Sequence, residues 1–189
     1  MFDDRQKTEP LRIIIGAGKQ AYDGWISTNK EDLDLLCPED WKRSFKNRLV
    51  DAFLCEHVWE HLTEAEGRVA AKLCYKYLKP GGYLRCAVPD ANFPHKWYQN
   101  MVQVGGPGPR DHPAADHKIV YDYKLFSAIF ADAGFEVDLL EYCDETGRFH
   151  YHQWSFAQGK IYRSLLSDHR NQDGEIGCVS LIIDAKKPE

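Results

Sequence analysis

The feature that most constrains this chain is a short apolar segment that runs directly into a group of polar residues. Residues 50–55 are mostly apolar and contain no helix breaker, which is the pattern of a buried strand. Glu56, His57, Glu60 and His61 follow at once. A strand of this kind delivers the carboxylates and imidazoles that follow it to one end of a sheet. The sequence therefore predicts a crevice at the carboxyl end of this strand.

A helix and a second strand are predicted to follow. Thr63 and Glu66 have the spacing of a capping box, and apolar residues recur with a helical period up to the Lys-Pro-Gly-Gly stop at residues 79–82. Residues 83–88 predict a strand. Such a crossover is almost always right-handed and joins parallel strands, and ligands bind outside the carboxyl ends of these strands. The polar residues after the first strand and Asp90 after the second are therefore expected on one rim.

The string EHVWEHL, the helix, and the string LKPGGYLRCAVPD together resemble the second half of a class I S-adenosylmethionine-dependent methyltransferase domain, of the small predicted methyltransferase kind. The resemblance extends from about residue 11 to the end of the chain. It implies one α/β, Rossmann-like domain over residues 1–189, with a mostly parallel sheet and an antiparallel C-terminal strand. It also implies S-adenosyl-L-methionine as the cofactor.

The N-terminal half contains a glycine turn after its first strand. Residues 1–10 are polar and predict an arm, and residues 11–15 predict a strand that enters Gly16-Ala17-Gly18. A strand followed by Gly-x-Gly suits a cofactor that passes close to the backbone, and an ordinary tight turn is the alternative. With Ala21 the turn matches the dinucleotide fingerprint, but Asp23-Gly24 interrupts the helix which that fingerprint requires. A nicotinamide or flavin enzyme is therefore disfavoured.

The segments after this turn are shorter than the resemblance leads one to expect. Nine residues separate the first strand from the next one, predicted at residues 25–29. Because a parallel crossover usually takes a dozen residues or more, the first crossover helix is expected to be abbreviated. Residues 33–36 predict a very short third strand, and residues 37–47 a polar loop over the adenine side of a cofactor, with Trp41 either walling that pocket or covering the core.

The resemblance also implies which residues contact the cofactor. Gly16 and Gly18 would approach its methionine portion. Asn29 occupies the position where the family usually has an acidic residue for the ribose hydroxyls, and an amide can still accept one such hydrogen bond. The complete set expected to bind the cofactor is Gly16, Ala17, Gly18, Asn29, Leu36, Cys37, Glu56 and His57.

A long Gly- and Pro-rich segment after Asp90 contains two acid–histidine pairs, Asp111-His112 and Asp116-His117. Long loops at this end of a sheet often bind substrate, and a carboxylate can orient an imidazole for proton transfer. If methyl transfer needs a general base, His117 is the first candidate and His112 the second, with Asp116 or Asp90 orienting it. For any single histidine, a solvated loop residue is the alternative.

The C-terminal part predicts a helix from Asp122 to Gly134 and strands over residues 135–142 and 178–185. In the resembling family the last two strands pair antiparallel. Residues 143–177 would then be an insertion that forms a flap or the contact of a homodimer, and they include one further short strand near residues 147–154.

Composition narrows the partners. A net charge of −5 and a pI near 5.9 give no field that would attract nucleic acid, and no apolar run approaches the roughly 20 residues of a membrane span. The expected location is the cytoplasm, without membrane contact. Six cysteines occur without a C-x-x-C pair, which favours reduced thiols in the core.

Three functions are compatible with the sequence. Methyl transfer from S-adenosylmethionine to an unidentified small polar molecule is the first. The second is an inactive binding or structural protein, suggested by Asn29 and the missing helix. The third is a metal-dependent enzyme that uses the histidine-rich loops, although no H-E-x-x-H spacing is present and no metal ligand is assigned. The histidines considered for it are His112, His117, His150, His152 and His169.

Overall fold

The computed structural model of the protein describes residues 9–189, apart from the side chains of residues 172 and 173. Of the predicted N-terminal arm, residues 1–8 fall outside the described part. The strands are β1 (Arg12–Ile15), β2 (Ile26–Thr28), β3 (Val50–Glu56), β4 (Leu78–Pro89), β5 (Glu136–Cys143), β6 (Phe149–Tyr151) and β7 (Ser180–Lys186). The helices are α1 (Pro38–Phe45), α2 (Glu64–Tyr77), α3 (Lys96–Val102) and α4 (Tyr123–Ala131), with 3-10 turns η2 (Trp59–His61), η3 (Phe156–Gln158) and η4 (His169–Gly174).

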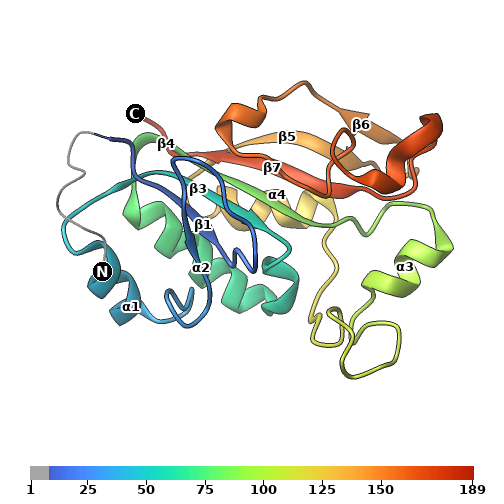
Figure 1. Ribbon diagram of the computed structural model, residues 1–189, viewed down its shortest axis with the longest axis horizontal. Helices are drawn as coiled ribbons and strands as arrows, with labels where there is room; N and C mark the ends of the chain where they lie inside the picture. The colour runs from blue at the N-terminus through green and yellow to red at the C-terminus, as the bar shows by residue number, and fades with distance from the viewer. Residues whose placement is uncertain (1–8) are drawn as a thin grey trace.

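The strands form one mixed sheet in the order β2-β1-β3-β4-β7-β5-β6. The first four strands are parallel to one another, whereas β7 runs antiparallel to both of its neighbours, β4 and β5. The last strand of the chain therefore inserts between two earlier ones, and the hairpin partner β6 forms the edge (Figure 1). The predicted α/β architecture with an antiparallel C-terminal strand is confirmed.

Two predictions for the segment between β2 and β3 are wrong. Residues 33–36 form turns rather than a strand, although Leu33 and Leu35 are buried. Residues 37–47 are not a polar loop, because α1 occupies most of them and begins with Pro38. Trp41 and Phe45, one helical turn apart, are fully buried, so the tryptophan covers the core instead of walling a cofactor pocket.

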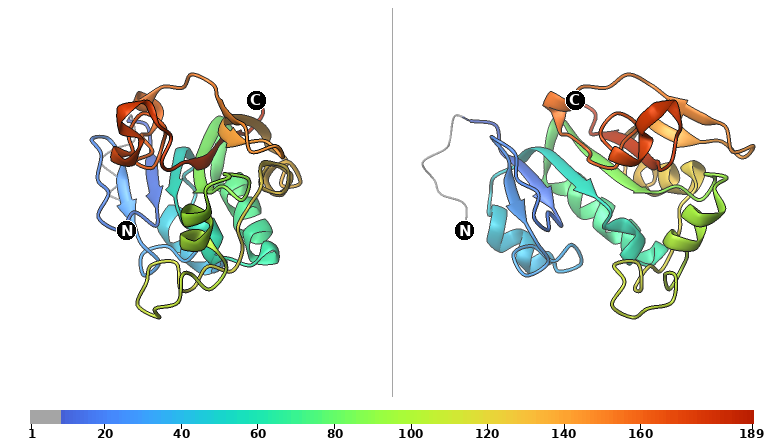
Figure 2. Two further views of the ribbon diagram at one scale, coloured as in Figure 1. Left: turned by 90° about the vertical axis from the view of Figure 1, so that its right-hand side faces the viewer. Right: turned by 45° about the vertical axis from the view of Figure 1, so that its right-hand side comes forward.

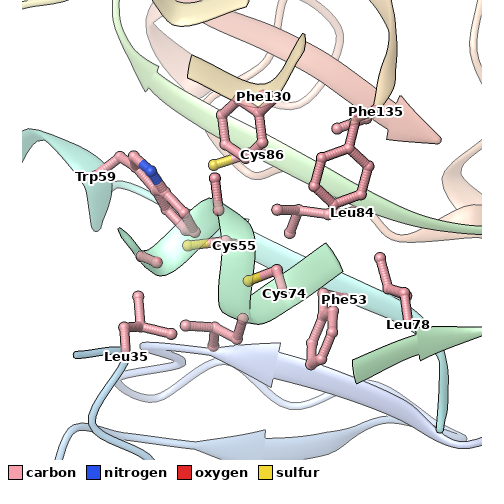
Figure 3. Close-up of a cluster of buried hydrophobic side chains, with 14 of the residues drawn as sticks. Leu35, Phe53, Cys55, Trp59, Cys74, Leu78, Leu84, Cys86, Phe130 and Phe135 are labelled. Carbon is pink, nitrogen blue, oxygen red and sulfur yellow. The ribbon is translucent and has the colours of Figure 1, made fainter. Parts of the chain in front are cut away.

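The central helix forms as its capping box predicts. Thr63 Oγ1 accepts a hydrogen bond from the backbone N–H of Glu66 at 3.3 Å, and the Glu66 carboxylate accepts one from the backbone N–H of Thr63 at 2.7 Å. Helices α1, α2 and α4 all lie on the same face of the sheet (Figure 1). Figure 3 shows Cys55 and Cys86 from neighbouring strands pointing into this layer, beside Cys74 of α2.

The opposite face of the sheet carries none of the helices α1, α2 and α4. Because successive side chains of a strand point to opposite faces, Ile14 lies on this face while its neighbours in β1 face the helices. Leu54 of β3 lies on the same face as Ile14. Ile161 and Trp154, from the chain between β6 and β7, pack in one cluster with these two side chains. Figures 1 and 2 show this orange and red part of the chain lying over the strands. The insertion thus supplies the second layer that a sheet with two apolar faces requires.

The face that the insertion covers is the one left open by the absent helix of the first crossover, between β1 and β2. The residues between β1 and β2 form turns without a helix, which confirms the expectation that this helix is abbreviated.

Two buried carboxylates of the sheet hold the insertion in place. Glu141 of β5 accepts hydrogen bonds from Trp154 Nε1 at 2.9 Å and from the backbone N–H of Leu165 at 2.8 Å. Glu56 of β3 does the same for residues 162 and 163.

All six cysteines are free thiols, as predicted, and five of them are buried. Across residues 9–189, none of the helices has the length and apolar character that crossing a bilayer requires.

Candidate functional site

A cavity of about 560 Å³ opens at the carboxyl ends of β1 and β3. Its walls come from five parts of the chain: the turn after β1, the end of β3 with η2, the end of β4 at Pro89, α3 with the loop that follows it, and the segment that leads from residue 162 to β7. Gly16 and Ala17 line it together with Glu56 and His57. The glycine turn and the acid–imidazole pair thus face one shared space, within the size range of small-molecule sites.

The glycine turn is fixed mainly by the protein's own packing. Gly16 has φ +61°, and a Cβ there would lie 2.4 Å from Cγ2 of Val58, so only glycine fits. Gly18 also has a positive φ, +55°, but a Cβ there would meet no atom within 4 Å. Its backbone N–H donates to Asn29 Oδ1 at 2.8 Å. The amide that was expected at the ribose therefore holds the turn with its oxygen.

The predicted site residues divide into two groups. Those that line the cavity are Gly16, Ala17, Glu56, His57, His112 and His117. Those that the structure places outside the lining are Gly18, Asn29, Leu36, Cys37, Asp90 and Asp116. The second group contains Asn29, which the resemblance implies at the ribose, and Leu36 and Cys37, which it implies at the adenine.

Asp90 is buried below the rim rather than exposed in it. Its carboxylate accepts hydrogen bonds from the backbone N–H groups of Asn92 at 2.8 Å and Cys143 at 2.6 Å. Burial raises the pKa of Asp90 to about 6, against the lowering effect of these two bonds. The carboxyl group joins the end of β4 to β5, which is a structural arrangement.

Glu56 has a full set of partners within the chain. Its carboxylate accepts from Gln20 Nε2 at 2.7 Å and from the backbone N–H groups of Tyr162 at 2.9 Å and Arg163 at 2.8 Å. One side chain at the end of β3 thus connects the turn after β1 to the insertion. It shapes the cavity wall where these three segments meet.

A second polar group lies in η2 and just before it, and it contains His57, Glu60 and His61. His57 has φ +57°, an uncommon backbone conformation for a residue with a side chain. Its Nε2 lies 3.0 Å from Ser180 Oγ and its Nδ1 2.8 Å from Glu60 Oε1. The signal that could have revealed this group is the H-x-x-E-H spacing, which places three side chains on one turn.

The fold gives new partners to one of the two acid–histidine pairs of the sequence, Asp116-His117. Asp116 Oδ1 lies 2.7 Å from Nδ1 of His61, not beside its neighbour His117. His117 instead places its Nδ1 2.8 Å from the carbonyl oxygen of Val102. The rings of His61 and His117 are in edge contact, with centroids 4.9 Å apart. Asp116 therefore orients a different imidazole from the one predicted.

Glu60 is a fully buried carboxyl group with the rings of His57, His61 and His117 close to it. Burial is the largest single effect on Glu60 and opposes its ionisation, but attraction by His57 and His61 and the other local contacts together outweigh it, so the pKa of Glu60 lies below its ordinary value. Burial likewise lowers the pKa of His117, which favours its neutral form. The other histidines considered for metal binding, His150, His152 and His169, do not line this cavity.

Comparisons with known proteins bear on the fold. No protein-family model and no curated protein sequence matches the chain. A S-adenosylmethionine-dependent methyltransferase from Archaeoglobus fulgidus superposes with a TM-score of 0.54 at 15% identity, over 96% of this chain and 87% of that one. A possible histamine N-methyltransferase from Thermotoga maritima gives 0.51 at 15%, over 95% and 82%.

An O-methyltransferase family protein from Burkholderia thailandensis gives a TM-score of 0.54 at 10% identity, with 96% of this chain covering 52% of that longer one. At such identities the likeness concerns the arrangement of the backbone. The antiparallel C-terminal strand of this chain is the one that the resemblance in sequence implies. The chain has the fold of the class I S-adenosylmethionine-dependent methyltransferases.

Proposed function

We propose that the protein transfers a methyl group from S-adenosylmethionine to a small polar molecule. The observation that carries this proposal is the shared cavity, in which the Gly16-Ala17 turn faces Glu56 and His57. The sulfonium donor is already activated, so the protein mainly has to hold donor and acceptor in line. A cavity between the ends of two parallel strands suits that task.

The composition of the lining supports a polar acceptor. Imidazoles, carboxylates and the cationic side chains of Arg163 and Arg170 supply hydrogen-bonding groups, while Trp97, Tyr98 and Met101 supply apolar surface. Sites with a few convergent polar groups in an otherwise apolar wall fix the orientation of small ligands. His112 and His117 remain the candidates for a general base, because both line the cavity.

One observation favours the alternative of a binding protein that has lost the donor. Asn29 uses its amide oxygen for the backbone N–H of Gly18, and neither it nor the residues expected at the adenine line the cavity. Under this alternative the cavity would hold a different ligand, and neither S-adenosylmethionine nor S-adenosylhomocysteine would bind.

Calorimetric titration and thermal unfolding with S-adenosylmethionine and with S-adenosylhomocysteine distinguish a methyltransferase from a binding protein that has lost the donor. A ligand at a hundred times its dissociation constant adds about 2.7 kcal/mol to the free energy of unfolding. Gly18→Val adds a side chain in open space next to the Gly16-Ala17 part of the cavity wall, and it should weaken binding at least about tenfold because the donor is proposed to pass this turn. Gly24→Val is the matched control, since Gly24 also has a positive φ and open surroundings. Absence of binding to the unmodified protein would contradict methyl transfer.

A further inference from the structure

Three side chains in the cavity wall have the composition of a metal site. A carboxylate oxygen of Glu60, a ring nitrogen of His61 and a ring nitrogen of His117 all lie within 4.8 Å of one another. Glu60 and His61 are adjacent in η2, whereas His117 comes from the end of the long loop after α3. All three line the cavity. Two imidazoles and one carboxylate form a common ligand set for divalent transition metals.

The partners of the two rings select the nitrogen that could bind an ion. Nδ1 of His61 faces a carboxylate oxygen of Asp116, and Nδ1 of His117 faces the carbonyl oxygen of Val102. Both partners are acceptors, so the tautomer that satisfies them carries its proton on Nδ1. Nε2 of each ring is then the nitrogen with a free lone pair. In metal sites, histidine ligands are typically oriented by this kind of second hydrogen bond.

Glu60 is the strongest indication of an absent partner. Its side chain is 0% exposed, and neither carboxylate oxygen accepts a hydrogen bond from any described residue. His57 Nδ1 lies 2.8 Å from Oε1, close enough for an ion pair, but without the angle of a hydrogen bond. A buried charge without such partners is costly, and buried charges are usually paired or bound to a metal.

We propose that Glu60, His61 and His117 bind one divalent transition-metal ion, through a carboxylate oxygen of Glu60 and Nε2 of each histidine. His57 Nδ1 lies 2.8 Å from the carboxylate, and His57 is itself held by Ser180 Oγ at 3.0 Å. Ligand atoms about 2.1 Å from an ion are at most about 4.2 Å apart. Ligand atoms that lie up to 4.8 Å apart must therefore move closer when an ion binds, and the partly exposed side chain of His61 has room to move.

The position of the site suggests what the ion does. It lies in the wall of the same cavity as the glycine turn, with coordination positions left open toward the cavity. An ion there would bind an oxygen of the methyl acceptor, which favours a hydroxyl-bearing acceptor. With His117 bound to the ion, His112 is the remaining candidate for the general base. This role of the ion rests on the methyl transfer proposed above, whereas the metal site itself does not.

The test uses full-length protein without a histidine tag, stripped of metal with EDTA. CoCl₂ is titrated while the visible absorption of the ion is recorded, and ZnCl₂ is titrated by calorimetry. We expect saturation at one equivalent of either ion and a higher Tm in its presence. His61→Ala and Glu60→Gln should each abolish the one-equivalent binding.

His150→Ala is the matched control. His150 also faces a carboxylate at 2.7 Å, that of Asp144, and its side chain is 30% exposed compared with 29% for His61. It should retain full binding. A wild-type protein that takes up no stoichiometric ion, or equal losses in His61→Ala and His150→Ala, would overturn the proposal. If Glu60→Gln fails to fold, His61→Ala decides, because its side chain is partly exposed.

Titration of S-adenosylhomocysteine into the metal-free protein separates the two proposals. Metal uptake without nucleoside binding would support the metal site and remove the methyl transfer. Nucleoside binding without metal uptake would overturn only the metal site.

Discussion

Arg85 of β4 and Asp184 of β7 form a bidentate ion pair between neighbouring strands, with Nε and Nη2 each 2.8 Å from a carboxylate oxygen. Arg85 is fully buried, and its Nη1 donates to the carbonyl oxygens of Ser155 at 2.8 Å and Gly159 at 2.7 Å. The ring of Trp154 stacks 4.7 Å from the guanidinium carbon. One side chain thus attaches the insertion to the face of the sheet that helices α1, α2 and α4 leave uncovered.

Replacing this arginine should be among the most destabilising single changes. Arg85→Met leaves the buried Asp184 without its partner and two carbonyl oxygens without a donor, so we expect a loss of about 3–5 kcal/mol in the free energy of unfolding. Urea denaturation measures it. Lys79→Ala is the control, because its ion pair with Asp51 is solvent-exposed and should contribute less than about 1 kcal/mol. Equal losses would contradict the role of Arg85 as the anchor of the insertion.

Glu56→Gln should loosen the insertion locally. A single amide oxygen cannot accept from Gln20 and from both backbone N–H groups of residues 162 and 163, so at least one partly buried hydrogen bond is lost. The expected cost is about 1–3 kcal/mol. Hydrogen exchange should quicken at those two amides while the amides of β7 keep their protection. Gln20→Ala, which removes one donor and leaves both backbone bonds, should leave this exchange unchanged, and an equal effect would refute the assignment.

The glycine turn should not tolerate a side chain at its first position. Gly16→Ala combines a positive φ with a contact of 2.4 Å to Val58, whereas Gly24→Ala, with φ +77° and no atom within 4 Å, has the backbone strain alone. Gly24→Ala should cost about 1 kcal/mol and Gly16→Ala clearly more. Adding Val58→Ala to Gly16→Ala should restore part of the extra stability that Gly16→Ala loses relative to Gly24→Ala. Identical Tm values for the two glycine variants would disprove the contact.

Asp90 should make stability fall as the pH rises from about 4 to about 6. Burial raises its pKa in the folded state to about 6 from an ordinary 3.8, so the folded protein binds the proton more tightly than the unfolded chain. This contribution is fully present below about pH 4 and is lost as the pH rises through 6, with a total of roughly 3 kcal/mol. Denaturation of wild type and Asp90→Asn across this pH range measures the free energy of unfolding of each. Its dependence on pH should be flatter in the variant. Parallel pH profiles would argue against it.

The centre of the fold was predictable because its signals are local. The capping box at Thr63 and Glu66 and the apolar run of β3 specify their own elements from a few neighbouring residues. The segment from Leu33 to Phe45 was predicted wrongly for the opposite reason. Its alternation of leucine and aspartate imitates a strand, while Trp41 and Phe45 make a helix whose stability depends on a core contributed by distant residues.

The sequence by itself determined which residues could do chemistry: the turn at Gly16, the acid–imidazole group after β3 and the histidines of the long loop. Only the tertiary structure decided their partners. It set Asp116 against His61, 55 residues away, and it brought His117 to Glu60. It also placed the insertion over the face left open by the missing helix. These contacts depend on how the sheet orders its strands, and no local pattern records the position of a residue in three dimensions.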